Sequence, residues 1–274
     1  MSGNPEFRRQ LWLELTPYRL AGIPLLLAGV FYIAYLADNS RIGAAMETAS
    51  VVIFLGLTFL WGNRQAAESV IAEMRDRTWD WQRMSSIDPW SLSWGKLFGS
   101  TICAWYGGAF CIAVYFAATG DPAYDSIRMA AMLVLGAVFC QSSGLLAGLQ
   151  LIVIKDRGYS RSFSSGFILL SLLALPAIIP KMTHKGSFFW YGAEYFKTDF
   201  LIGSLLCFDS WLIAGIYFLV REEFKFRTAP VAWPAFTLFM MIYAAGFAGN
   251  FPEKSCFSPS RLMVAFAVAC VLTY

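Results

Sequence analysis

Eight apolar runs separated by short polar segments constrain this chain more than any other feature of its sequence. Hydrophobic residues make up 58% of the chain and charged residues only 14%, whereas soluble domains carry about 25% charged residues. A helix needs about 20 apolar residues to cross a bilayer, so we predict an all-α polytopic transmembrane helical bundle of about seven or eight spans. The runs cover residues 20–36, 44–62, 97–117, 127–154, 163–179, 200–220, 233–248 and 262–274.

The first and last runs set the expected limits of the membrane domain. The run at 20–36 is longer than the apolar core of a signal peptide and no A-x-A cleavage site follows it, so we expect it to remain as a span. The run at 262–274 is too short to cross a bilayer, and we expect the natural chain to continue past residue 274. The chain therefore divides into a cytoplasmic interfacial helix, residues 1–19, and a transmembrane domain, residues 20–274.

The distribution of Lys and Arg predicts the orientation. The segments 1–19, 63–96, 155–161 and 221–232 hold 14 of the 21 basic residues. Because cytoplasmic loops carry the excess of basic residues, we expect a multi-pass protein of the cell (inner) membrane with its N-terminus in the cytoplasm. The net charge of +3 is too small to indicate a nucleic-acid partner, and membrane lipids are the expected surroundings.

The N-terminal segment has the pattern of an amphipathic helix. Phe7, Leu11, Leu15 and Tyr18 recur on one helical face, with charged residues off that face. This pattern is typical of a helix that lies at the membrane interface, and the alternative is an ordinary charged flank before the first span.

Residues 63–96 form the longest polar stretch and carry ten charges, five of each sign. We predict one helix that ends near Arg77, a short helix through Met84, and a third helix that starts at Asp88-Pro89 as N-cap and first residue. Tryptophans mixed with charges of both signs are typical of a surface that contacts another protein. A helix lying flat on the membrane is an equally good interpretation.

Cysteine and histidine supply little material for a metal or nucleophilic site. The six cysteines contain no C-x-x-C pair, and His184 is the only histidine. We therefore expect no metal site and no catalytic residue in this chain.

Two stretches resemble a known family. Residues 4–11, NPEFRRQL, resemble the opening of permease subunits of ABC type-2 exporters, and residues 66–99 resemble their intracellular segment. Arg77 departs from the family, which usually has Gly before the Thr, so the local turn is expected to differ. The matching positions in the second stretch are Ser69, Val70, Glu73, Arg75, Thr78, Met84, Pro89, Gly95, Lys96 and Leu97.

The resemblance implies a transport permease without its own ATPase site. Its partners would be an ABC nucleotide-binding ATPase subunit, which uses ATP and Mg, and a second permease copy or homologous permease. It implies a cytoplasmic coupling helix between spans 2 and 3, and it implies no cofactor for this chain, whose sequence contains no G-x-x-x-x-G-K-[ST] phosphate loop. The residues expected to contact the ATPase are Glu73, Arg75, Asp76, Arg77, Thr78, Trp79, Trp81 and Arg83.

Polar and small residues inside the runs suggest further sites. Asp209 and Gln141 are candidates for a translocation path, and the other interpretation of each is hydrogen bonding that holds helices together. Gly136, Gly144 and Gly148 form a small-residue stripe that predicts close helix packing, either at a dimer interface or within one subunit.

Two other classes of function compete with the exporter. Glu222, Glu223 and Arg227 form E-E-x-x-x-R, the first motif of intramembrane CAAX-type proteases, but those enzymes need histidines in later spans and His184 precedes the motif. A proton-coupled secondary transporter is the second alternative, because Asp209 could carry a proton. The sequence does not indicate which substrate is transported.

Overall fold

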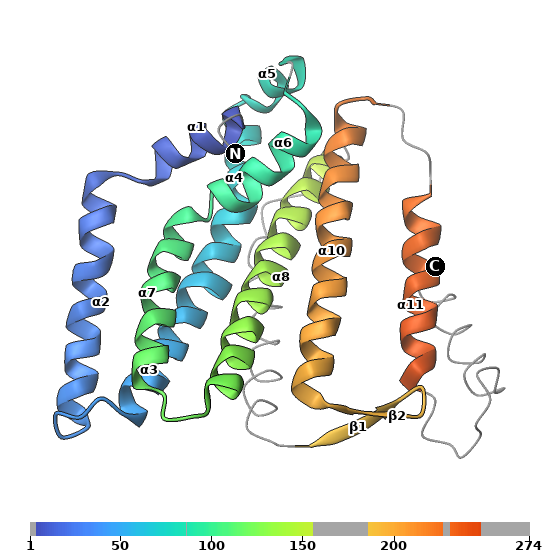
Figure 1. Ribbon diagram of the computed structural model, residues 1–274. Coiled ribbons are helices and arrows are strands. Elements are labelled where there is room, and N and C mark those ends of the chain that lie inside the picture. The colour runs from blue at the N-terminus through green and yellow to red at the C-terminus, as the bar shows by residue number, and fades with distance from the viewer. Residues whose placement is uncertain (1–3, 86, 156–185, 227–230, 248–274) are drawn as a thin grey trace.

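The computed structural model describes residues 4–85, 87–155, 186–226 and 231–247. Helix α1 (Pro5–Glu14) lies across one end of a helical bundle, and α2 (Pro17–Ala37) runs from there to the other end (Figure 1). The chain returns through α3 (Ala44–Leu55), the π-helical turn η1 (Gly56–Trp61) and α4 (Gly62–Arg75), which join end to end.

The second part of the bundle begins beside α1. Two short helices there, α5 (Trp79–Met84) and α6 (Pro89–Trp94), lead through the π-helical turn η2 (Gly95–Gly99) into α7 (Ile102–Ala118). The remaining elements are α8 (Ala123–Lys155), the antiparallel strands β1 (Ser187–Trp190) and β2 (Ala193–Phe196), α10 (Lys197–Glu223) and α11 (Ala232–Ala245).

Three helices begin with the same local signal, a capping side chain followed by proline. Asn4, Thr16 and Asp88 accept hydrogen bonds from amide groups in the first turns of α1, α2 and α6. Proline suits the first helical position because its missing N–H would have no partner there. The predicted break near residue 77 and the predicted start at Asp88-Pro89 are confirmed.

The structure confirms a mostly helical protein but not the count of seven or eight spans. Four helical segments in the described residues are long and apolar enough to cross a membrane, and the bent pair of Pro89–Gly99 with Ile102–Ala118 would make a fifth. Helix α11 has 14 residues and is shorter than a full span. The expected spans at 163–179 and 262–274 lie outside the described residues. The four segments are Pro17–Ala37, Ala44–Arg75, Ala123–Gln150 and Lys197–Glu223.

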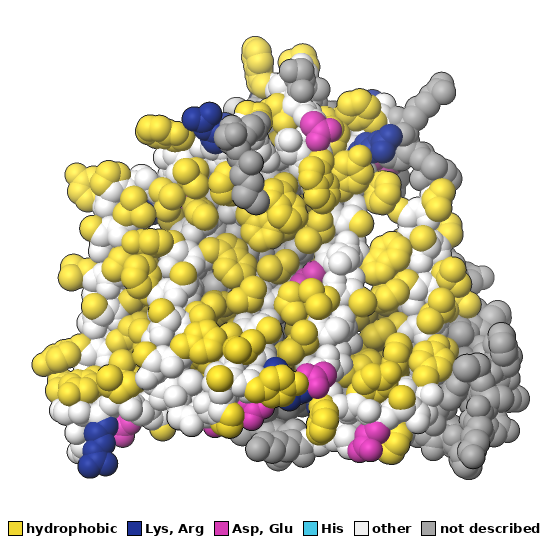
Figure 2. All heavy atoms as spheres, in the orientation of Figure 1, with side chains coloured by type: hydrophobic (Ala, Val, Ile, Leu, Met, Phe, Trp, Pro, Cys, Tyr) yellow, Lys and Arg dark blue, Asp and Glu magenta, His cyan; other side chains and the backbone are white. Residues whose placement is uncertain are grey.

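Apolar side chains cover most of the lateral face in Figure 2, and charged side chains gather mainly at the two ends of the bundle. Helix α2 alone exposes Leu25, Leu26, Tyr32 and Ile33 by more than half. Water would not accommodate so much contiguous apolar surface, whereas lipid would. The helices are those of a membrane-embedded protein.

The small-residue stripe of α8 is used within the subunit. A Cβ atom at Gly136 would lie 2.7 Å from the Phe59 ring in η1, and one at Gly148 would lie 2.9 Å from the Ala67 carbonyl oxygen in α4. At Gly144 the Asn63 carbonyl oxygen would be 2.8 Å away. Helices α4 and α8 therefore approach each other as closely as the glycines allow.

Candidate functional site

Helix α1 docks onto η2 through its polar face. A Cβ atom at Gly95 would lie 2.9 Å from Glu6 Cβ, and one at Gly99 would lie 2.7 Å from Gln10 Cβ, so both glycines are needed for this close approach. Glu6 and Gln10 are buried, whereas Trp12 is 82% exposed. The helix turns Glu6 and Gln10 inward because charged partners lie there. Tyr18, at the start of α2, is 89% exposed, and the expected position of the apolar face at the membrane interface stays a prediction.

Those partners form a cluster that we call the charge junction: Glu6 and Arg9 of α1, Glu73 of α4 and Lys96 of η2. Lys96 is 1% exposed and forms ion pairs with Glu73 and, at 3.7 Å from Nζ to Oε1, with Glu6. Arg9 pairs with Glu6 at 2.8 Å and also with Glu73. Two positive and two negative charges meet, so the junction is neutral as a whole.

The surroundings of Glu6 and Arg9 shift both groups toward their charged forms. Burial alone would raise the pKa of Glu6, but the Arg9 hydrogen bond and the nearby charge of Lys96 outweigh it and lower this pKa below 4.5. The hydrogen bond to Glu6 raises the pKa of Arg9, and burial opposes that change. Both residues therefore stay ionised, as the ion pairs require.

The charge junction also holds α5 and the end of α10. Gln82 Nε2 donates a hydrogen bond of 2.8 Å to Glu73 Oε1. The Trp79 ring lies 5.4 Å from Lys96 Nζ, and its centroid lies 6.5 Å from that of Phe224, just after α10. Four helical segments and η2 thus converge on one neutral cluster, which is buried at Lys96 and Glu6 and open to solvent at Arg9.

The structure places two of the expected ATPase-contact residues inside the chain. Glu73 is 9% exposed and Trp79 is 4% exposed, so these side chains pack inside the chain and do not present themselves to a partner. Both side chains point inward because Lys96 is buried: its charge pairs with Glu73, and its ammonium group lies over the Trp79 ring.

The other expected contact residues lie at the tip of the bundle. The exposed residues from the end of α4 through α5 form one surface, which we call the apical surface (Figure 1). Its members are Arg75, Asp76, Arg77, Thr78, Asp80, Trp81 and Met84. Trp81 and Met84 are each 73% exposed. The side chain of Arg83, within α5, lies outside the described ones. Arg77 has a φ of 58°, the left-handed conformation that glycine favours.

Gln141 acts as an interhelical link in the described structure. Its Nε2 donates to the Thr58 carbonyl oxygen in η1 at 3.2 Å, and its Oε1 accepts from Trp105 Nε1 in α7 at 2.8 Å. Gln141 is fully buried, and both ends of its amide have partners. This is the arrangement of hydrogen bonds that joins α8 to two neighbouring helices.

Asp209 differs from Gln141 because its carboxylate has no such partner. It is 5% exposed on α10, and neither of its oxygens accepts a hydrogen bond within the described part of the chain. It lies within electrostatic reach of Cys140 on α8. The expected role in holding helices together therefore has no visible partner group.

Metal ligands and the E-E-x-x-x-R motif are the remaining features raised by the sequence. Among the described residues, no group of three His, Cys, Asp or Glu side chains is placed to hold a metal ion. Glu222 and Glu223 lie at the end of α10, whereas Arg227 and His184 lie outside the described residues.

Sequence reasoning did not identify Glu6, Arg9 or Lys96 as a cluster. The available signal was the Gly95-x-x-x-Gly99 spacing around Lys96, which permits a helix to dock there.

Comparison of the chain with protein-family models, curated proteins and solved structures finds no match. The interpretation of the site therefore rests on its residues and geometry.

Proposed function

We propose that this chain is the membrane-spanning permease subunit of an ABC type-2 exporter and that a separate ATPase subunit binds its apical surface. The observation that carries the proposal is the connection between that surface and the spans. The apical surface is exposed and carries charges of both signs beside Trp81 and Met84. Directly beneath it, the charge junction joins α4, α1 and η2.

The proposed mechanism is mechanical coupling. An ATPase dimer that closes on ATP and Mg would push on the apical surface. Because α4 continues into η1 and α3, and Lys96 ties α4 to the start of the bent α6–α7 pair, the push would move spans 2 and 3 together. The substrate is unassigned, and the full transporter would contain a second permease copy or a homologous permease.

Co-purification with a co-expressed candidate ABC ATPase subunit tests the proposal. Trp81→Ala removes an exposed aromatic anchor from the apical surface and should weaken co-purification about tenfold or more. Trp12→Ala is the matched control, because Trp12 is similarly exposed but lies on α1. Arg75→Glu should act like Trp81→Ala, since it reverses one charge of the same surface. Unchanged co-purification and ATPase stimulation in both apical variants would contradict the proposal.

The proposal includes an orientation, with the apical surface in the cytoplasm. A membrane-impermeant thiol reagent applied to intact cells should label Glu194→Cys in β2 and spare Ser85→Cys after α5, in a background without native cysteines. Both positions are exposed at opposite ends of the bundle. Labelling of Ser85→Cys alone would reverse the orientation and remove the ATPase contact from this account.

Proton-coupled transport is the second candidate, because the buried Asp209 lacks a hydrogen-bond partner among the described residues. An intramembrane carboxylate of this kind is a functional-site hypothesis by default. Reconstituted vesicles separate the two candidates. Transport driven by ATP in the presence of the ATPase subunit favours the exporter, and transport driven by a pH gradient without ATP, and lost in Asp209→Asn, favours the secondary transporter.

A further inference from the structure

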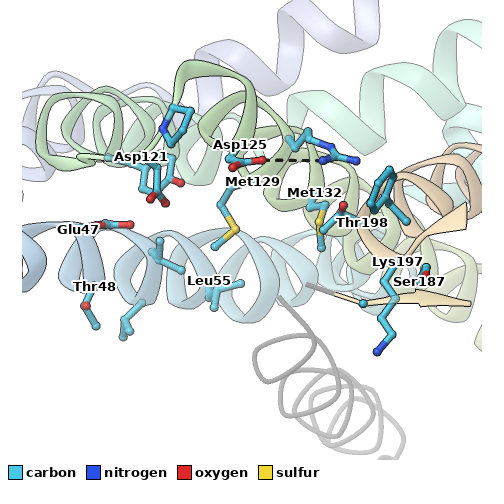
Figure 3. Close-up of a pocket in the computed structure, with 17 residues that line it drawn as sticks. Glu47, Thr48, Leu55, Asp121, Asp125, Met129, Met132, Ser187, Lys197 and Thr198 are labelled. Carbon is cyan, nitrogen blue, oxygen red and sulfur yellow. Dashed lines mark ion pairs between the residues drawn. The ribbon is translucent and has the colours of Figure 1, made fainter. Parts of the chain in front are cut away.

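A large cavity lies at the end of the bundle opposite the apical surface. Its volume is about 1010 Å³, at the upper end of the range of about 300–1,000 Å³ for small-molecule sites. Helix α3, the end of α7, the following loop, helix α8, the two β-strands and the start of α10 form its walls (Figure 3). None of these elements belongs to the charge junction, so a role of this cavity is independent of the coupling proposal.

One side of the cavity is negatively charged. Glu47 of α3 and Asp121 of the loop between α7 and α8 face the same space in Figure 3, and the two carboxylates are close enough to repel each other. Neither has an ion-pair partner among the residues that the structure describes. Two like charges on the same side of a cavity attract a cation from solution.

The basic residues of the cavity do not neutralise these two carboxylates. Arg128 donates from Nε to Asp199 Oδ1 at 2.7 Å, and its Nη1 lies 3.8 Å from Asp125 Oδ1. Its charge is thus balanced by acids of α8 and α10. Lys197 lines the far side of the cavity, and Figure 3 shows its side chain directed away from Glu47 and Asp121.

The rest of the wall is apolar and aromatic. Leu55, Met129 and Met132 lie between the acidic side and the start of α10 (Figure 3). Tyr115 also lines the cavity, and its phenol group lies within electrostatic reach of both Glu47 and Asp121. Carboxylates beside an apolar wall suit an organic cation, because they attract its charge while the wall buries its apolar body. Methionine adapts to apolar ligands of different shape because its side chain is flexible.

We propose that this cavity binds an organic cation with an apolar body, held by Glu47 and Asp121 at the charged side and by the methionine wall along the rest. A metal ion suits the site less well, because no group of three metal-ligating side chains occurs in the described part of the chain. The proposal concerns binding to the folded chain and does not depend on transport or on an ATPase.

Tetraphenylphosphonium and tetraphenylborate make a sharp pair of probes, because they have nearly the same size and shape but opposite charge. Equilibrium dialysis of the purified full chain in a neutral detergent, against protein-free micelles, should show tighter binding of the phosphonium. Glu47→Gln and Asp121→Asn should each weaken phosphonium binding about five- to tenfold, the effect of removing one charge-assisted contact. Tetraphenylborate binding should not weaken in either variant.

Two further variants complete the test. Asp38→Asn removes a carboxylate at the C-terminal end of α2, at the same end of the bundle but outside the cavity lining, and it should leave phosphonium affinity unchanged. Met129→Trp should fill the apolar part and weaken phosphonium binding without changing charge. Asp121 lies in an exposed loop, so its replacement leaves the fold intact even if Glu47→Gln unfolds the chain. Wild-type phosphonium affinity in Asp121→Asn and Met129→Trp, or equal binding of both probes, would overturn the proposal.

Discussion

Replacing Lys96 by Met is the most direct test of the charge junction. The change keeps the length and the apolar stem of the side chain but removes its positive charge. Glu6 and Glu73 would then share Arg9 as their only cation in the junction, and one negative charge would remain uncompensated. Because Lys96 is 1% exposed and Glu6 is 2% exposed, water cannot replace the lost partner.

The expected loss follows from this burial. Removing one partner of a buried ion pair costs about 3–5 kcal/mol, because the other charge is left unpaired. We expect the free energy of unfolding of Lys96→Met to fall by that amount. The double variant Lys96→Met/Glu73→Gln leaves only the neutral pair of Glu6 and Arg9, so its loss should be smaller than the sum of the two single losses by about 1–3 kcal/mol.

Unfolding of the purified chain in mixed micelles, followed by tryptophan fluorescence, measures these differences. Arg64→Gln is the control, because Arg64 and Glu68 form an i,i+4 pair in which both side chains are more than half exposed. Its effect should stay within about 0.5 kcal/mol. A loss below about 1 kcal/mol in Lys96→Met, or strict additivity in the double variant, would refute a stabilising junction of this kind.

Three further predictions concern the same fold. Folding lowers the pKa of Glu6 below 4.5. The stability that Glu6 contributes should therefore be complete above the pKa that this group has in the unfolded chain, and it should disappear as pH falls through the lower pKa of the folded chain. Glu6→Gln should make the free energy of unfolding fall less steeply between about pH 6 and about pH 3. Gly144→Leu should destabilise the chain by about 1–3 kcal/mol or more, since its Cβ would meet the Asn63 carbonyl, whereas Gly29→Leu, with open space around it, should not. Gln141→Leu should cost about 1–3 kcal/mol for each buried group that it leaves unpaired in η1 and α7, measured in the same unfolding assay.

Local sequence signals predicted the ends of helices well. Asp88 and Pro89 are neighbours in sequence and act within one turn, so their effect on the start of α6 can be read without knowledge of the fold. The small-residue stripe of α8 also predicted close packing, although only the structure shows that its partners are η1 and α4 of the same chain.

The charge junction could not be predicted in the same way. Glu73 is separated from Arg9 by 64 residues and from Lys96 by 23, and the cluster exists only after α1 has docked on η2. A pattern of mixed charges in a polar loop indicates exposure on average, since most charged residues are exposed. It does not show which of those charges are satisfied within the chain, and Glu73 is one that is.

Once the buried, internally paired residues are set aside, the exposed tryptophans can be compared as candidates for membrane contact or for protein contact. Trp12 is exposed beside exposed Leu13, and both continue toward the apolar surface of α2, as expected of a helix that meets lipid. Trp81 is instead exposed beside Asp80, on a short helix that follows a charged turn. A membrane surface favours a continuous apolar face, whereas a protein partner can match an isolated aromatic side chain with a surrounding set of opposite charges. Under the proposed function, α1 would lie at the membrane interface and α5 would contact the protein partner, which is why Trp12→Ala and Trp81→Ala should differ in the co-purification experiment.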